Sequence, residues 1–212
     1  MENATRASKL AELEELRERV AELEKELAVA GDDDSTPDWR KSSYFSYYAT
    51  TGFFLGILGA LTSLLVNVFG AIAKGLPPLK MIMVYLTFGM GERALTVDSS
   101  SNAALALSIG CCLYIGTGML YGILFQLVLS QLGGDTLGRR MVVASVLALG
   151  IWFVNYYVLL SWLQPLLFGG NWIIEQIPLA VATLTHLVYG WTQALVYPLG
   201  VWQPYRVETA SE

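Results

Sequence analysis

Four long apolar stretches dominate the pattern of hydrophobic and polar positions along this chain. They cover residues 44–73, 103–132, 141–168 and 177–202, and none of them contains Asp, Glu, Lys or Arg. A helix of about 20 apolar residues is long enough to cross the ~30 Å hydrocarbon core of a bilayer. Each stretch exceeds that length. The pattern therefore predicts an all-α polytopic membrane protein with four transmembrane helices.

A shorter apolar segment, residues 81–91, lies between the first two predicted spans. It follows Pro77 and Pro78, which interrupt a helix, and it precedes Glu92 and Arg93. A helix of this length rises only ~16 Å, about half the thickness of the hydrocarbon core. We therefore predict a re-entrant or interfacial half-helix rather than a fifth span.

The first 30 residues carry a heptad pattern of apolar positions. Its members recur at alternating intervals of three and four residues: Leu13, Leu16, Val20, Leu23 and Leu27. With Leu13 at position a, a parallel partner would place its Arg17 opposite Glu12 and its Glu24 opposite Arg19, and both pairs attract. This pattern predicts a cytoplasmic coiled-coil helix over residues 1–30. The alternative is an amphipathic helix whose leucines rest on a different protein.

The distribution of cations predicts the orientation in the membrane. With four spans, one side carries most of the positive charge near the spans (Arg40, Lys41, Arg139, Arg140 and Arg206), and the other side carries Lys74, Lys80 and Arg93. The positive-inside rule then places both termini in the cytoplasm, and we expect a bacterial inner membrane. Residues 31–43 are interpreted as a polar linker and interfacial anchor, 44–202 as the membrane domain and 203–212 as a cytoplasmic tail.

Small residues line one face of each of the first two spans. The candidates for helix packing are Gly52, Gly56, Gly59 and Ser63 in the first span and Gly118 and Gly122 in the second. Lipid provides little hydrophobic drive between helices, so close backbone approach and interhelical hydrogen bonds hold them together. These faces are predicted to pack within the bundle or against another subunit.

A polar stripe is predicted along the last two spans. Its members are Asn155, His186, Gln193 and Tyr197. Polar side chains inside a membrane normally face the protein interior, so the two spans are expected to turn these residues toward each other or toward a partner. We interpret His186 as a structural, neutral residue that helps to set the register of the two spans.

The last span also carries a motif with a resemblance to known sequences. The run from Thr185 to Gly190 (T-H-L-V-Y-G), followed by Val196 and Tyr197, resembles the last helix of small four-span bacterial membrane proteins of unassigned function. Residues 113–122 are similar to a first copy of the motif, with Gly116 in the place of Gly190 and Cys112 in the place of the histidine. The resemblance implies a pair of two-helix units and no particular activity.

Composition excludes several classes of function. An excess of Asp and Glu (18) over Lys and Arg (13) leaves no basic footprint for nucleic acid. The adjacent Cys111 and Cys112 lack the spacing of a zinc site and are interpreted as small buried hydrophobes. His186, the single histidine, cannot form a bis-histidine haem site within one chain, and its span contains no carboxylate to orient it for hydrolysis. No catalytic residue, cofactor site or metal site is predicted.

The expected function follows from what remains. We expect a non-catalytic accessory or scaffold subunit that contacts membrane lipids. It would associate with itself or with a larger membrane complex, such as a respiratory or photosynthetic one, through the coiled coil and the small-residue faces. The alternative is a small transporter or channel-like protein that uses residues 81–91 and the His186 stripe. A redox subunit with a haem shared between chains ranks third.

Overall fold

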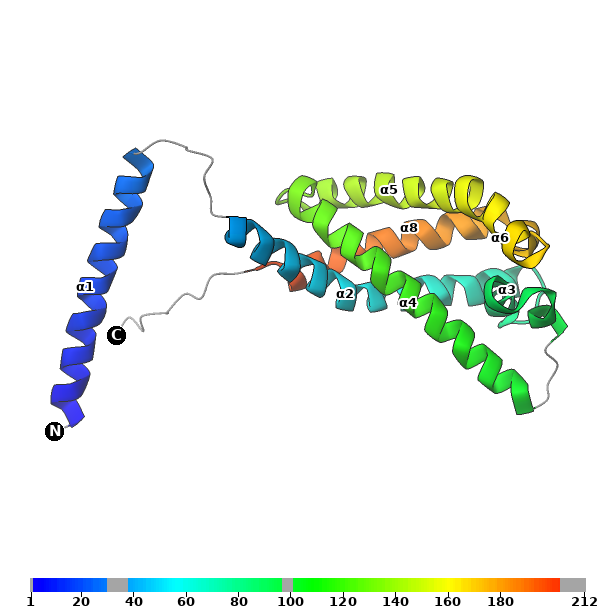
Figure 1. Cartoon of the computed structure of the whole chain (residues 1–212), viewed down its shortest axis with the longest axis horizontal. Helices are drawn as coiled ribbons and strands as arrows, with labels where there is room; N and C mark the ends of the chain where they lie inside the picture. The colour runs from blue at the N-terminus through cyan, green and yellow to red at the C-terminus, as the bar shows by residue number, and fades with distance from the viewer. Residues whose placement is uncertain (1, 30–37, 97–100, 203–212) are drawn as a thin grey trace. The chain divides into compact units, whose positions relative to one another are not determined.

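The computed structural model describes residues 2–29, 38–96 and 101–202. The chain divides into two units, Met1–Ser43 and Tyr44–Glu212. All the regular structure in the described residues is helical, which confirms the all-α prediction (Figure 1). In the first unit, α1 (Glu2–Val29) is a single uninterrupted helix. The predicted linker residues 31–37 and the predicted tail 203–212 lie outside the described residues.

Four helical segments are long and apolar enough to span a membrane, as predicted: Tyr44–Ala73, Ala104–Leu132, Leu137–Phe168 and Leu179–Gly200. The first span lies in α2 (Asp38–Ala73) and the second is α4 (Ser101–Leu132). The third span is composite, because α5 (Leu137–Phe153) leads through a π turn, η2 (Val154–Leu160), into α6 (Ser161–Phe168). The fourth joins α8 (Leu179–Val196) to a 3₁₀ turn, η3 (Tyr197–Gly200).

Local capping moves three helix boundaries away from the predicted positions. The third span begins at Leu137, because the hydroxyl of Thr136 accepts a hydrogen bond from the Arg139 N–H at 3.4 Å and starts the helix there. The fourth span begins only after Pro178, because proline forces the preceding Ile177 into an extended conformation. The short helix α7 (Trp172–Gln176) fills the connection. Residues 38–43, predicted as part of a linker and anchor, form the first turns of α2.

A half-helix forms where the sequence predicts one. It is α3 (Lys80–Met90), and Gly91, with a positive φ of 61°, ends it before a 3₁₀ turn, η1 (Gly91–Thr96). Its Met81, Val84 and Leu86 are buried, and the helix packs against α4, α6 and α7. α3 is therefore part of the core of the second unit.

One buried glutamine joins three of these short elements. Gln164 of α6 is fully buried and lies immediately before Pro165. Its Nε2 donates to the Thr87 hydroxyl of α3 at 2.9 Å, and its Oε1 accepts from the Ile173 N–H of α7 at 3.1 Å. Both ends of the amide are satisfied, so the side chain holds the two short helices against the end of the third span.

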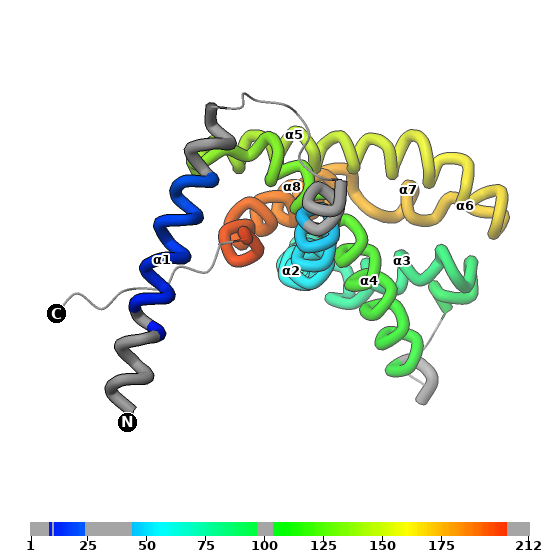
Figure 2. Tube along the Cα trace, turned by 60° about the vertical axis from the view of Figure 1, so that its left-hand side comes forward, coloured from blue at the N-terminus to red at the C-terminus, as the bar shows by residue number. Residues whose placement is uncertain are grey.

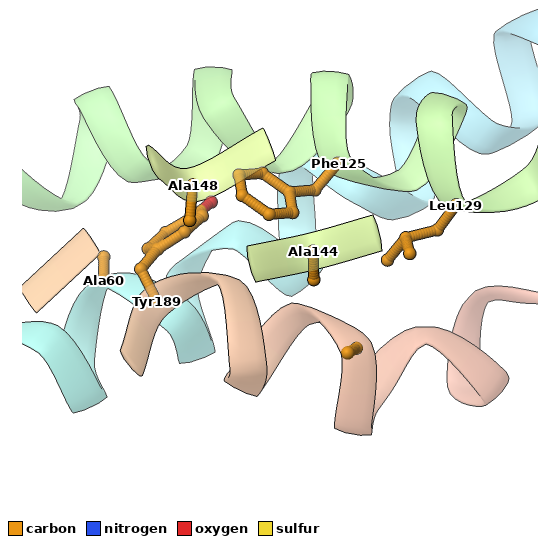
Figure 3. Close-up of a cluster of buried hydrophobic side chains, with 7 residues drawn as sticks. Ala60, Phe125, Leu129, Ala144, Ala148 and Tyr189 are labelled. Carbon is orange, nitrogen blue, oxygen red and sulfur yellow. The ribbon is translucent and has the colours of Figure 1, made fainter. Parts of the chain in front are cut away.

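The main core lies where α4, α5 and α8 meet. Phe125 of α4 packs edge-on against Tyr189 of α8, with ring centroids 5.3 Å apart (Figure 3). Gly190 lets α8 approach Ala144 and Ala148 of α5 closely. α5 lies alongside α8, whereas α4 and α5 diverge from the loop at residues 133–136 that joins them (Figures 1 and 2). This divergence separates the middle of α4 from η2.

Candidate functional site

The heptad positions of α1 are exposed in the single chain. The exposed fractions of Leu13, Leu16, Val20 and Leu23 range from 39% to 60%. Leu27 lies outside the residues whose side chains the structure describes. Arg19, predicted to face Glu24 of a partner helix, contacts Glu22 of its own helix at 2.7 Å. Such an exposed ion pair contributes little to stability, so Arg19 could exchange Glu22 for Glu24 of a partner helix, and the coiled coil stays a prediction.

The small-residue faces of the first two spans meet inside the chain. A Cβ atom added to Gly56 would lie 2.5 Å from the carbonyl oxygen of Gly118, and one added to Gly122 would overlap the carbonyl oxygen of Gly52. The backbones of α2 and α4 therefore touch at this crossing. Gly59 instead faces the side chains of Tyr189 and Gln193 on α8.

A polar cluster extends this crossing toward α3. The hydroxyl groups of Ser63 and Tyr114 share a hydrogen bond at 2.8 Å, and Asn67 Nδ2 donates to the Tyr114 oxygen at 3.1 Å. Tyr85 of α3 donates to Asn67 Oδ1 at 3.5 Å. Ser63 was a predicted packing residue, whereas sequence reasoning missed the two tyrosines. The spacing of four between Tyr114 and Gly118 could have placed Tyr114 on the same face.

The four members of the predicted polar stripe have different neighbours in the structure. Asn155 accepts a hydrogen bond from Tyr121 of α4 at 2.7 Å, and the ring of His186 bonds the Ala182 carbonyl of its own helix. Gln193 donates to the Leu55 carbonyl of α2 at 3.1 Å, and the Arg140 guanidinium lies 5.5 Å from the Tyr197 ring centroid. The four residues have different neighbours because the helices cross, so that one face of a helix meets different helices along its length.

Asn155 and His186 line one cavity of about 450 Å³. Residues of α2, α3, α4, α5, η2, α6, α7 and α8 form its wall. The polar residues among them are Ser63, Tyr85, Tyr114, Thr117, Tyr121, Asn155, Tyr156, Thr185, His186 and Tyr189. Ser63, Thr185 and Tyr189 are buried, whereas Leu113, Thr117 and Leu159 are exposed. The cavity therefore has a polar, buried wall and a rim between α4 and η2 that carries Leu113, Leu159 and a single polar side chain, Thr117. None of the described residues that line it is Asp, Glu, Lys or Arg.

Two hydrogen-bonding groups at this cavity have capacity to spare. His186 Nδ1 lies 2.7 Å from the Ala182 carbonyl oxygen, which can only accept, so Nδ1 carries a hydrogen, and Nε2 is then an acceptor whenever the ring is neutral. Tyr156 of η2 is 95% buried (5% exposed), and its hydroxyl has no hydrogen-bond partner among the described residues. Sequence reasoning missed Tyr156, because nothing in the apolar and aromatic run 153–160 distinguishes a π turn from an ordinary helix.

The described part of the chain holds no cluster of three His, Cys, Asp or Glu residues that could bind a metal ion. Both cysteines are free thiols. The interpretation of the cysteines as buried needs a correction, because Cys111 is only half-buried and Cys112 is exposed on the outward face of α4. No family model, curated protein or solved structure matches the chain.

Proposed function

We propose that this protein is a non-catalytic membrane scaffold subunit that associates with a second copy of itself through α1. The observation that carries the proposal is the exposed apolar stripe of Leu13, Leu16, Val20 and Leu23 on a helix that belongs to a separate unit from the four spans. Charged residues surround the stripe on α1. A continuous apolar seam of this kind is buried when two such helices pair.

Charge complementarity favours a second copy as the partner. In a parallel pair, Glu12 faces Arg17 and Arg19 faces Glu24, and each contact occurs twice because of the two-fold symmetry. The seam covers fewer than three full heptads, a length at which an isolated pair of helices is marginal. Anchoring both chains in one membrane raises their effective concentration and compensates for the short seam.

The transporter alternative has one supporting observation, since α3 and His186 border the same cavity. Transport of an ion would need charged or strongly polar groups along a pathway. The described cavity wall carries no charged side chain, and this favours the scaffold over an ion transporter.

We propose further that both termini lie in the cytoplasm, in a bacterial inner membrane. The contact of Gly52 with Gly122 brings the start of α2 and the end of α4 to the same end of the bundle, beside Arg139 and Arg140. In the sequence, Arg40 and Lys41 come shortly before the first span, and the positive-inside rule favours the cytoplasm for segments that carry such an excess of Lys and Arg next to the spans.

Reporter fusions test this orientation. A reporter active only in the cytoplasm should be active after Glu212 and inactive when inserted between residues 99 and 101, because an odd number of spans separates the two positions. A second reporter, active only outside the cytoplasm, should give the reverse result. Equal activity of one reporter at both positions would contradict the four-span topology.

Crosslinking tests the association through α1. Starting from a chain with Cys111→Ala and Cys112→Ala, the change Leu16→Cys should give disulfide-linked dimers in membranes. Adding Val20→Asp and Leu23→Asp should abolish them, because two buried carboxylates per helix cannot be accommodated in an apolar seam.

The matched control places the same two charges away from the seam. Ala11→Asp and Ala21→Asp add equal charge at heptad positions f and b, so the dimer should still crosslink. Persistence of the crosslink with Val20→Asp and Leu23→Asp would show that the heptad is not the interface.

A further inference from the structure

We propose that the cavity between α4 and η2 binds an uncharged, hydroxyl-bearing lipid that enters sideways from the bilayer. This inference concerns the membrane unit alone and does not depend on whether α1 pairs. It uses three features of the cavity, namely its rim, its hydrogen-bonding groups and its lack of charge.

The rim of the cavity is suited to entry from lipid. Leu113 of α4 and Leu159 of η2 border the cavity and are 55% and 38% exposed. Both residues lie in segments long and apolar enough to span a membrane, so their exposed faces are the ones that acyl chains would cover. A lipid chain can therefore reach the cavity without crossing water.

The deep wall offers both a donor and an acceptor to a head group. Nε2 of His186 has no protein partner in the described residues and accepts a hydrogen bond. The Asn155 side chain uses its oxygen to accept from Tyr121, which leaves its Nδ2 group to donate. The hydroxyl of Tyr156 has no partner among the described residues, and a buried polar group in that state requires an explanation.

The π turn places two of these groups in adjacent positions of one helix. Asn155 and Tyr156 are consecutive, both lie in η2 and both line the cavity. Single π turns within α-helices occur frequently at functional sites, and this one carries two of the polar residues that line the cavity.

The absence of charge on the wall restricts the head group. A phosphate or carboxylate would lose its hydration without gaining a cationic partner from the described lining residues. A hydroxyl group, by contrast, can donate to an acceptor such as His186 Nε2 or accept from a donor such as Asn155 Nδ2. The volume of about 450 Å³ is within the usual range for small-molecule sites. Diacylglycerols and isoprenoid alcohols share this chemistry.

Photocrosslinking of the full chain in phosphatidylcholine vesicles tests the proposal. The probes are a diacylglycerol, farnesol and a phosphatidylglycerol, each carrying a diazirine and an alkyne tag. At least one of the two uncharged probes, the diacylglycerol or farnesol, should label peptides of α4 and η2, and excess of its untagged form should compete. The stronger of the two labels identifies the source of the hydroxyl. Equal or stronger labelling of these peptides by phosphatidylglycerol would overturn the proposal.

A pair of adjacent tyrosines provides the variant and its control. Tyr156→Phe removes only the hydroxyl that has no protein partner, so the fold should be kept, while labelling should fall about five- to tenfold through loss of one hydrogen bond. Tyr157→Phe makes the same change on a side chain that is exposed and does not line the cavity, and labelling should stay unchanged. Equal labelling of the wild type and Tyr156→Phe would overturn the assignment of this hydroxyl to the head group.

A second pair of variants tests the lateral entrance without altering the deep wall. Thr117 lies on the exposed rim and its hydroxyl bonds only the backbone of its own helix, so Thr117→Phe adds bulk at the mouth. This change should reduce labelling at least fivefold. Thr183→Phe alters a threonine with the same kind of helix bond on α8, away from the cavity lining, and should have no effect. Unchanged labelling in Thr117→Phe would exclude entry between α4 and η2.

Discussion

Gly122→Ala is expected to destabilise the membrane bundle by about 2–3 kcal/mol, although it adds a single methyl group. The new Cβ would overlap the Gly52 carbonyl oxygen and lie 2.7 Å from the Gly56 Cα atom. Both neighbours are backbone atoms, so no side chain can rotate to make room and the helices must separate. The midpoint of unfolding in a denaturing detergent, followed by circular dichroism, measures the loss.

The matched control is Gly116→Ala, which lies on the same helix. A Cβ at Gly116 meets no atom within 4 Å, so the change should be neutral or stabilising by up to about 1 kcal/mol, the usual gain from replacing glycine inside a helix. The midpoint of unfolding should therefore fall in Gly122→Ala and stay the same or rise in Gly116→Ala. Equal midpoints would show that α2 and α4 do not cross at these glycines.

Gln164→Leu is expected to destabilise the protein by about 2–3 kcal/mol, because it leaves the buried Ile173 N–H without its acceptor. Leucine occupies a similar volume, so a large cavity does not contribute. The first effect should be local, since Gln164 joins α6 to α3 and α7. Unfolding in a denaturing detergent measures the loss of global stability, and faster proteolysis near α7 measures the local loss of structure.

Gln131→Leu provides the comparison for this variant. Gln131 is exposed near the end of α4, so the same change there should have little effect on unfolding. If both glutamine variants unfolded alike, the Ile173 N–H would not depend on the Gln164 side chain.

The number and composition of the spans could be predicted because they depend on properties local to each segment. Charge-free length decides whether a helix can cross a bilayer, and Pro77 and Pro78 mark the start of the half-helix α3. The boundaries were less accurate, because they depend on single contacts such as the bond between Thr136 and the Arg139 N–H. The small-residue faces could also be predicted from the sequence, since helical spacing aligns Gly52 with Gly56 and Gly118 with Gly122.

The partners of the polar residues could not be predicted in the same way. Helical periodicity gives the direction in which a side chain points but not which helix lies in that direction. Gln193 illustrates this, because the sequence places it on the His186 face while the structure turns it to the Leu55 carbonyl of α2. Tyr121, which donates to Asn155 from α4, lies 34 residues away and only the packing of the spans brings the two together.

The π turn also determines how the third span tolerates changes of length. A π turn already holds one residue more than the α-helical turn that it replaces, so a further residue inserted between positions 154 and 160 would swing the whole of α6 by about 100° around its axis. Gln164 would then face away from Thr87 and Ile173, even though the span would remain equally apolar and long enough to cross a bilayer. Hydrophobic length would be preserved while the registry of one half of the helix was lost. Over evolutionary time, single-residue insertions should therefore be rarer in this turn than substitutions between apolar residues.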